Sequence, residues 1–424
     1  MKSHTRVREE YYIIIMLAVC SFKWIFEGRF SFSFLEAAVL AIGLLPIIKR
    51  HIYINYGVWI WILAVVYIWI SMLINGTTAG NIIKATVLSL TVIYLVFADF
   101  SKINMNNVFN FIVKIGLFYA FFVFLHFILK EKFNELYFPL LSPYNQSYAQ
   151  AYYRGGRYFG LLYSPHELAG IFVFSIMTVF FRMVIDKKNL MKETALLLVF
   201  LFVLILTGKR GIMAAGILIT VMVVLLFYNS RKMWLNSIKI IATAFLSGAI
   251  FVFLMNMFPD SSIFYRINRI LRRFSTGIFF DNERKALYKL ATNIWQQNKV
   301  FGIGWRNFIF STIDNHQFAM GHQVNCDYLQ WLCELGIIGF VICISAVIIN
   351  LVKSIWLCRN LKKIVDNAKK KAALFGIAIQ FFIIIYAFIE VPFYDILFFA
   401  FYIFSCIIVN GICRELKMKG TLNE

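Results

Sequence analysis

Apolar runs of about twenty residues recur along this chain, and each is long enough to cross the hydrocarbon core of a bilayer as a helix. Hydrophobic residues make up 61% of the 424 residues, and charged residues only 15%. That composition excludes an ordinary soluble globular domain. The sequence therefore predicts an all-α polytopic membrane protein.

We expect about twelve transmembrane helices. They are placed at residues 11–27, 31–48, 54–75, 79–98, 107–129, 166–185, 193–208, 210–228, 239–258, 328–352, 372–391 and 395–413. The first run shows no small-residue cleavage site, so we expect it to be a retained span and not a signal peptide. The prediction is one integral membrane domain over 1–424. It carries two long outer loops, 130–165 and 259–327, and the second of these contains short helices.

The net charge of +21 suggests an anionic partner. The basic residues are spread over short connections between apolar runs, which argues against nucleic-acid binding. Most of those short connections fit the positive-inside rule if both termini are cytoplasmic. This topology places both long loops on the extracytoplasmic face.

The cysteines lie in or beside apolar runs, with no CxxC pair and no metal-ligand spacing. We expect neither a disulfide framework, nor a metal site, nor a cofactor. The seven are Cys20, Cys326, Cys333, Cys343, Cys358, Cys406 and Cys413.

The first outer loop ends RGGRYFGLLYSPHELAG. Arg154 and Arg157 flank two glycines, and Ser164-Pro165 indicates the start of a helix. Arginine beside a flexible backbone suits close contact with phosphate, although contact with lipid headgroups is an alternative. The loop also holds tyrosines that could stack on sugars or anchor the loop at the bilayer interface. They are Tyr137, Tyr144, Tyr148, Tyr152, Tyr153 and Tyr158.

Further cations are expected on the same face. Lys209 and Arg210 occupy a short outer turn, where positive charge is normally avoided, unless they are an interfacial anchor. Arg284 stands in the first turn of a helix expected from Glu283 to Gln297, where the helix dipole disfavours a cation. An anionic partner would account for it. Three more arginines share one helical face that we expect to be solvated or to bind headgroups: Arg266, Arg269 and Arg273.

Residues 301–341 pass from a glycine-rich polar loop into an apolar helix expected to begin near Val324. Asn325 would lie in its first turn, with His322 just before it. His316 and Asp327 belong to the same polar stretch. Glu390, followed by Pro392 at an outer span end, could add an acid.

Four of these stretches, in order, resemble the O-antigen polymerase and ligase superfamily of bacterial envelope glycan enzymes, which includes the Wzy-type polymerases. They are RYFGLLYSPHELA, LTGKRG, ERKALYKLATNIWQQNKVFGIGWRNF and CDYLQWLCELGIIGF. The chain departs from the family pattern at three positions. His166 replaces an asparagine, Lys209 replaces a serine, and Asn325 stands at the family's histidine position, with His322 three residues earlier.

The resemblance implies transfer of a glycan from undecaprenyl pyrophosphate to an acceptor sugar hydroxyl. Arg157, Arg210 and Arg284 would hold the pyrophosphate, and His322, or a water held by Asn325, would accept the proton. No Asp-x-Asp occurs, so arginines would replace a metal. The expected location is the inner membrane of a bacterium, with the site on the extracytoplasmic face. Expected partners are the lipid-linked donor and acceptor, the bilayer and a chain-length regulator protein.

Polymerase is favoured over ligase because the tyrosine-rich loop and the replaced histidine depart from the ligase pattern. A ligase that transfers to lipid A-core remains the alternative. A transporter or flippase is less favoured, because it predicts charges deep in many spans, and only Lys23, Lys84 and Lys114 qualify.

Overall fold

The computed structural model describes residues 9–22, 33–48, 52, 56–227, 282–313 and 322–421. Within these ranges the chain is helical and contains no β-strand. The helices are α1 Glu10–Ser21, α2 Ser33–Ile48, α3 Tyr56–Asn75, α4 Ala79–Phe97, α5 Met105–Leu129, α6 Glu131–Tyr137, α7 Pro143–Arg154, α8 Pro165–Asp186, α9 Leu190–Leu206, α10 Arg210–Phe227, α13 Asn282–Gln297, α14 Phe308–Ile313, α15 Asp327–Arg359, α16 Asn367–Tyr386 and α17 Ile396–Thr421. Short 3₁₀ turns include η2 Phe100–Lys102 and η4 Leu361–Lys363.

Six of these helices are long and apolar enough to cross a membrane: α3, α4, α5, α8, α15 and α17. Shorter apolar helices lie at Glu10–Ser21, Phe34–Leu45 and Arg210–Leu225. The protein is therefore a multi-pass membrane protein. The expected total of twelve spans is not established. The span expected at 239–258 and part of the span expected at 11–27 lie outside the described residues, and each other expected span overlaps a helix.

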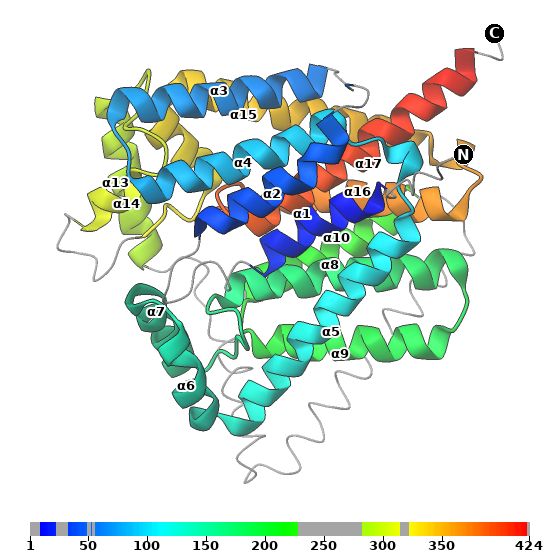
Figure 1. Ribbon diagram of the computed structural model, residues 1–424, viewed down its shortest axis with the longest axis horizontal. Coiled ribbons are helices and arrows are strands. Elements are labelled where there is room, and N and C mark those ends of the chain that lie inside the picture. The colour runs from blue at the N-terminus through cyan, green and yellow to red at the C-terminus, as the bar shows by residue number, and fades with distance from the viewer. Residues whose placement is uncertain are drawn as a thin grey trace, which may run out of the picture.

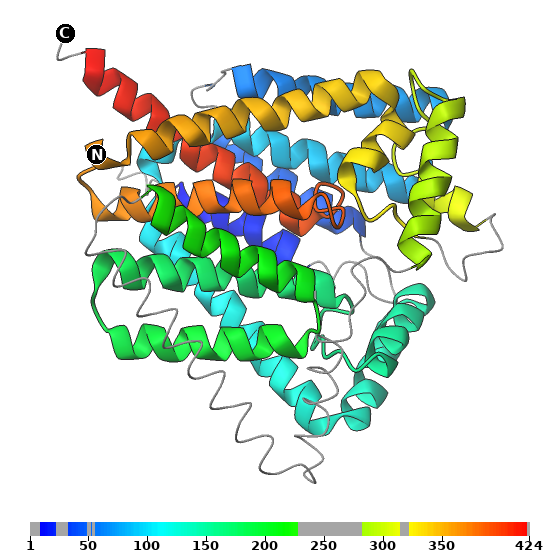
Figure 2. The same cartoon turned by 180° about the vertical axis from the view of Figure 1, so that it is seen from behind.

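The apolar helices form a bundle with α8, α16 and α17 packed at its centre (Figures 1 and 2). In α8 and α17 about nine tenths of the most apolar window is buried in the protein, at 94% and 89%. In α3 and α15, which pack against each other at one edge, the value is 39%. Exposed apolar side chains such as Trp59 and Leu63 on α3 therefore form a surface suited to lipid.

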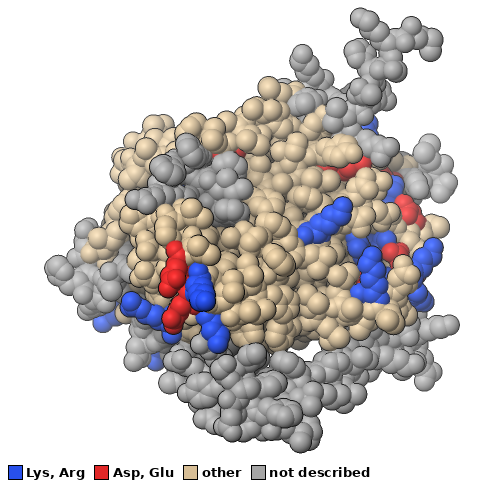
Figure 3. Space-filling view, turned by 60° about the horizontal axis from the view of Figure 1, so that its bottom comes forward, with Lys and Arg blue, Asp and Glu red and all other residues tan. Residues whose placement is uncertain are grey.

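The two ends of the bundle differ. Helices α7, α13 and α14 gather at one end, and the C-terminal end of α17 lies at the other (Figure 1). On the face shown in Figure 3, charged residues gather toward both sides, with a largely uncharged band between them. The segment 130–165, expected to be the first outer loop, is folded, because α6 and α7 span most of it. Ser142 caps α7 by accepting a hydrogen bond from the Asn145 N–H, and Pro143 occupies its first turn.

Helix α15 is broken at Gly336, whose φ of 66° and ψ of −171° are not helical. The loop that follows α13 fills the break: Ile303 and Gly304 donate backbone hydrogen bonds to the carbonyls of Cys333 and Glu334. A Cβ atom at Gly302 or Gly336 would collide with the backbone of the other segment. Two glycine motifs that are far apart in sequence therefore form one close backbone contact.

Tyr67 completes this junction from α3. Its hydroxyl donates a hydrogen bond of 2.9 Å to the carbonyl of Leu335, the residue just before the break. Its ring packs where a Cβ atom at Gly339 would stand. The sequence predicted a helix over 328–352 and gave no sign of this kink, which forms because the two glycines allow another backbone to approach.

Candidate active site

A cavity of about 280 Å³ opens at the end of the bundle that carries α7, α13 and α14. Its walls come from α7, the start of α8, the turn before α10, the loops at 303–309 and 322–325, and the connection from α16 to α17. Ligand pockets in proteins commonly measure about 300–1,000 Å³. The cavity lies just below the lower end of that range.

One wall of the cavity is a row of tyrosines on α7. Tyr144, Tyr148 and Tyr152 are spaced four residues apart, so they share one face of the helix, and all three line the cavity. Their ring centroids are 4.9 Å and 6.4 Å apart, and the hydroxyls of the first two are 3.3 Å apart. This wall offers flat apolar faces with hydroxyl edges, a surface suited to sugars.

Cations surround one carboxylate next to this row. The Glu390 Oε1 atom is 3.7 Å from the Lys209 Nζ atom and 3.2 Å from an Arg284 Nη2 atom. The Lys209 ammonium and the Arg157 guanidinium lie 5.8 Å and 5.4 Å from the centre of the Tyr152 ring. Residues from four distant parts of the sequence therefore converge at the Tyr152 end of the row.

The electrostatics of this group follow from burial and charge. Burial raises the pKa of Glu390, but Lys209, His166, Arg284 and Arg157 outweigh it, so the net pKa is lowered. Burial lowers the pKa of Lys209, and Glu390 opposes that shift. Burial and the Glu390 carboxylate raise the pKa of Tyr152 to about 12. Glu390 is thus ionised at neutral pH, and Tyr152 keeps its proton.

Local backbone geometry positions Arg157. Gly208 has a φ of 67°, and a Cβ atom there would stand 3.1 Å from the Arg157 Cγ atom. The Arg157 side chain therefore crosses the face of this glycine. The Tyr158 backbone N–H donates a hydrogen bond of 3.1 Å to the Leu206 carbonyl, which joins the segment before α8 to the turn before α10.

Arg210 is the first residue of α10 and is exposed, and it is not among the residues that line the cavity. Its neighbour Lys209 does line it. The turn that contains both residues thus presents the lysine to the cavity. Lys209 is the residue that replaces a serine of the family pattern.

His322 and Asn325 both line the cavity. The backbone N–H of His322 donates to the Thr312 hydroxyl at 2.9 Å, and the Asn325 carbonyl accepts from the Tyr288 hydroxyl at 3.2 Å. The expected helix start near Val324 is wrong. The helix begins at Asp327, because Asn325 has a left-handed φ of 59° that a helix cannot continue through.

Beside these residues, Glu334 holds the 303–309 loop in place. Its carboxylate is fully buried and accepts hydrogen bonds from the backbone N–H groups of Arg306 and Phe308, at 2.7 Å and 3.1 Å. Arg306 lines the cavity, has a φ of 63° and donates from its guanidinium to the Tyr394 carbonyl at 2.7 Å. Two of the cavity's residues, Arg306 and Asn325, thus adopt a conformation that residues with side chains rarely take.

The sequence assigned no role in the site to several residues that the structure brings into the cavity. Lys84 reaches it from α4, and His166 from the start of α8, where its Nδ1 atom is 2.7 Å from the Tyr386 hydroxyl. Glu167 and Asp395 add carboxylates to the lining. The arginine in GWRNF and the histidine in SPHEL were visible signals, but nothing in the sequence showed that they face one space.

Some expected residues cannot be placed. His316 and the arginines at 266, 269 and 273 lie outside the described residues, as does Lys23. Lys114 is described and exposed. In the part of the chain that the structure describes, no group of three or more His, Cys, Asp or Glu side chains could hold a metal ion.

Comparison with known proteins bears on these same elements. Residues 195–344 match the family model Wzy_C, described as O-antigen ligase. The matched stretch contains the turn with Lys209 and Arg210, helix α13, the 303–309 loop and the broken part of α15. A comparison with curated proteins finds no match. Over residues 195–344 the chain carries the domain of the O-antigen polymerase and ligase superfamily.

Proposed function

We propose that this protein is a polymerase of lipid-linked polysaccharide repeat units, for O-antigen or capsule. It would transfer a glycan from undecaprenyl pyrophosphate to an acceptor sugar hydroxyl on the extracytoplasmic face of the bacterial inner membrane. The observation that carries this proposal is the convergence of Arg157, Lys209 and Arg284 on Glu390, beside a cavity walled by tyrosines and containing His322. The family domain supports the same class of membrane glycan-transfer enzyme.

The cations match the leaving group of this reaction. When the bond from the anomeric carbon to the pyrophosphate oxygen breaks, negative charge grows on the pyrophosphate. Arg157, Arg210 and Arg284 are proposed to hold that group, with Lys209 added by its place in the cavity lining. Glu390 keeps the Lys209 and Arg284 side chains together before the donor binds. No metal is required for this charge to be stabilised.

The acceptor side of the reaction needs a base. His322 is proposed to take the proton of the acceptor hydroxyl as its oxygen attacks the anomeric carbon from the face opposite the pyrophosphate. Attack from that face inverts the configuration of the anomeric carbon. A water held by Asn325 is the alternative base. The tyrosine row, with the carboxylates of Glu167 and Asp395, would bind the sugar rings and their hydroxyls.

The proposed topology follows from the same placement. The domain over residues 1–424 would put both termini in the cytoplasm. The first outer loop, 130–165, whose helix α7 lines the cavity, and the large outer loop, 259–327, would stand outside. A chain-length regulator protein is a further proposed partner.

A ligase is the second candidate, because the matching family model is described as O-antigen ligase. The two reactions share a donor and differ in the acceptor, which is a lipid-linked repeat unit or lipid A-core. Deletion of the gene separates them. Surface glycan of a single repeat unit indicates a polymerase, whereas polymer that accumulates on its carrier lipid indicates a ligase.

Complementation of the deletion strain tests the site itself. Arg284→Ala and His322→Ala should be inserted in the membrane at normal levels and fail to restore long glycan chains. Long chains in both variants would contradict the proposed reaction centre. A transporter remains a weaker alternative: Lys84 lines the cavity, but Lys114 is exposed. If the protein is a transporter, the purified protein should move the lipid-linked glycan and show no polymerisation activity.

A further inference from the structure

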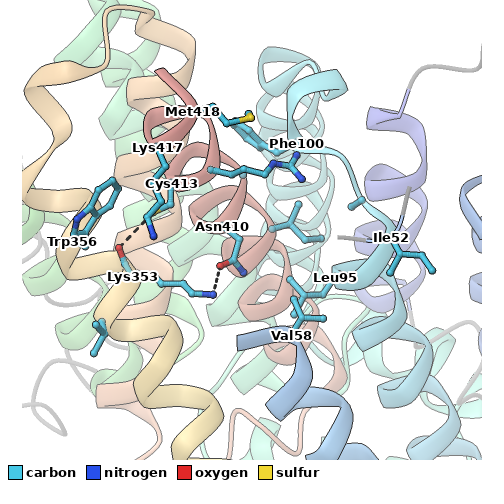
Figure 4. Close-up of a pocket in the computed structure, with 15 residues that line it drawn as sticks. Ile52, Val58, Leu95, Phe100, Lys353, Trp356, Asn410, Cys413, Lys417 and Met418 are labelled. Atoms are coloured by element: carbon cyan, nitrogen blue, oxygen red, sulfur yellow. Dashed lines mark hydrogen bonds between the residues drawn. The ribbon is translucent and has the colours of Figure 1, made fainter. Parts of the chain in front are cut away.

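A second cavity, of about 570 Å³, lies at the other end of the bundle, away from α7, α13 and α14 (Figure 4). It is a groove between the start of α3, the end of α4, the second half of α15 and the last turns of α17. Because it opens between helices suited to lipid contact, its occupant can come from the bilayer. Nothing in the proposed reaction uses it.

The lining of this groove contains three cations. Lys353 comes from α15, and Arg414 and Lys417 come from α17. Among the described residues that line the groove, none is Asp or Glu. The Lys353 ammonium donates to the Asn410 side chain at 2.8 Å, and the Lys417 ammonium lies 5.8 Å from the centre of the Trp356 ring.

Arg414 is partly neutralised from outside the groove. Its Nη2 atom is 3.1 Å from an Asp99 carboxylate oxygen, and Asp99 also pairs with Lys102 at 3.1 Å. The positive charge of the lining therefore exceeds the negative charge beside it. Such a rim attracts an anion at the bilayer surface.

The rest of the groove is apolar. Val58, Leu95 and Val352 line it, and the side chains of Ile52 and Met418 at its edge are 60% and 52% exposed. A small hydrophilic anion would leave this surface without a partner, and an uncharged hydrocarbon would leave the cations without one. The lining therefore matches one molecule with an anionic head and an apolar tail.

We propose that this groove is a binding site for an anionic phospholipid of the surrounding bilayer. Its phosphate lies against Lys417, Arg414 and Lys353, and an acyl chain lies along Val58, Leu95 and Val352. The short basic connections that face this end are the ones assigned to the cytoplasm from the charge distribution. The bound lipid joins α3, α15 and α17. It stabilises the folded protein, because a ligand that binds only the folded state stabilises that state more as its concentration rises above its dissociation constant.

The test uses the full-length protein in neutral detergent micelles, with thermal unfolding as the readout. Phosphatidylglycerol should raise the unfolding midpoint, and phosphatidylcholine with the same acyl chains should raise it much less. In Lys417→Gln, about five-fold more phosphatidylglycerol should be needed for the same shift. The matched control is Lys362→Gln with Lys363→Gln, which removes exposed charges from η4 at the same end.

A second variant keeps every cation in place. Met418→Glu puts a carboxylate at the exposed edge of the groove, where it should repel the lipid phosphate. Like Lys417→Gln, it should reduce the rise in unfolding midpoint that phosphatidylglycerol causes. An equal rise in unfolding midpoint with the two lipids would overturn the proposal. So would an effect of phosphatidylglycerol that is reduced in the η4 control as much as in Lys417→Gln. Protection by inorganic phosphate at the same concentration would also overturn it, since the site would then recognise phosphate alone.

Discussion

The guanidinium of Arg284 lies 3.2 Å from the carboxylate of Glu390, although 106 residues separate them in the chain. This pair joins the first turn of α13 to the connection between α16 and α17. It explains why an arginine is tolerated near a helix N-terminus, since a carboxylate compensates for the unfavourable dipole. Lys209 shares the same carboxylate.

Removal of a single cation from this group should reduce glycan transfer sharply. We expect Lys209→Ala, Arg157→Ala and Arg284→Ala each to lower the turnover of lipid-linked repeat units roughly 10²–10³-fold, the usual cost of a lost donor to developing charge. The measurement is chain extension by the purified protein. Arg210→Ala provides the comparison: it should also lose activity, but no more than Lys209→Ala, because Arg210 is exposed. Full activity in Arg284→Ala would contradict the proposal that these cations hold the pyrophosphate.

Glu390→Gln should destabilise the folded protein by roughly 1–3 kcal/mol at neutral pH, because it leaves two partly buried cations without their acid. The folded pKa of Glu390 is lowered from its ordinary value of 4.5. Its stabilising effect is therefore present above that value and is lost as the pH falls through the lowered pKa. The difference in unfolding midpoint between wild type and Glu390→Gln should shrink below pH 4.5.

The control for this variant is Glu415→Gln, which removes a pair with Lys369 far from the cavity. It should also lower the unfolding midpoint while leaving activity unchanged. A difference between wild type and Glu390→Gln that grows on acidification would contradict the assigned charge of Glu390.

His322→Ala should lower turnover by about 10²–10⁴-fold, the range for loss of a positioned base. Added imidazole should restore part of the activity, since it can take the place left by the side chain. Imidazole would not repair a loss of folding. Its rescue of activity, together with assays at several pH values, therefore separates loss of the base from loss of folding. Normal turnover in His322→Ala would move the role to His316 or Asp327.

Tyr148→Ala should raise the KM for the glycan substrate by about ten-fold, while kcat falls much less, because a stacking surface acts on binding. Tyr148→Phe keeps the ring and should restore most of the loss. Tyr153 offers a matched control on the same helix. It stacks on His126, at 5.5 Å between ring centres, and does not line the cavity. An unchanged KM in Tyr148→Ala would show that the row does not bind sugar.

Gly336→Ala should destabilise the protein by about 2–5 kcal/mol, because the new Cβ atom combines a left-handed φ with a backbone collision. Gly80→Ala is the control, since its nearest neighbour is 4.0 Å away at an exposed helix start. It should leave the unfolding midpoint unchanged or slightly higher. Expression and unfolding of the two variants can be compared directly. Equal stability would show that the backbone contact at Gly302 is not required.

The sequence predicted the helical, membrane-embedded architecture well, because apolar length is a local property that needs no knowledge of tertiary contacts. Helix α13 was also predicted closely. The break in α15 was not, because it depends on a loop more than thirty residues away that enters between Leu335 and Ile337. The predicted total of twelve spans stays a prediction, because the structure does not describe residues 228–281.

Part of the candidate site could be singled out from the sequence. Arginine and histidine in polar loops signal anion binding and proton transfer, so Arg157, Arg284 and His322 could be singled out. Sequence reasoning could not decide which of two adjacent cations, Lys209 and Arg210, faces inward, because the turn before α10 sets that direction. The place of Glu390 among the cations likewise follows only from packing.

Arg306 and Asn325 carry positive φ angles at the wall of the cavity. Glycine would take either backbone shape at no cost, whereas a residue with a side chain sacrifices roughly 1–3 kcal/mol of stability there. The folded protein is thus less stable than it would be with glycine at these two positions, and it keeps a guanidinium and an amide there. Replacement of Arg306 by glycine should therefore relieve the backbone strain, but it should also remove the guanidinium bond that ties the 303–309 loop to the Tyr394 carbonyl.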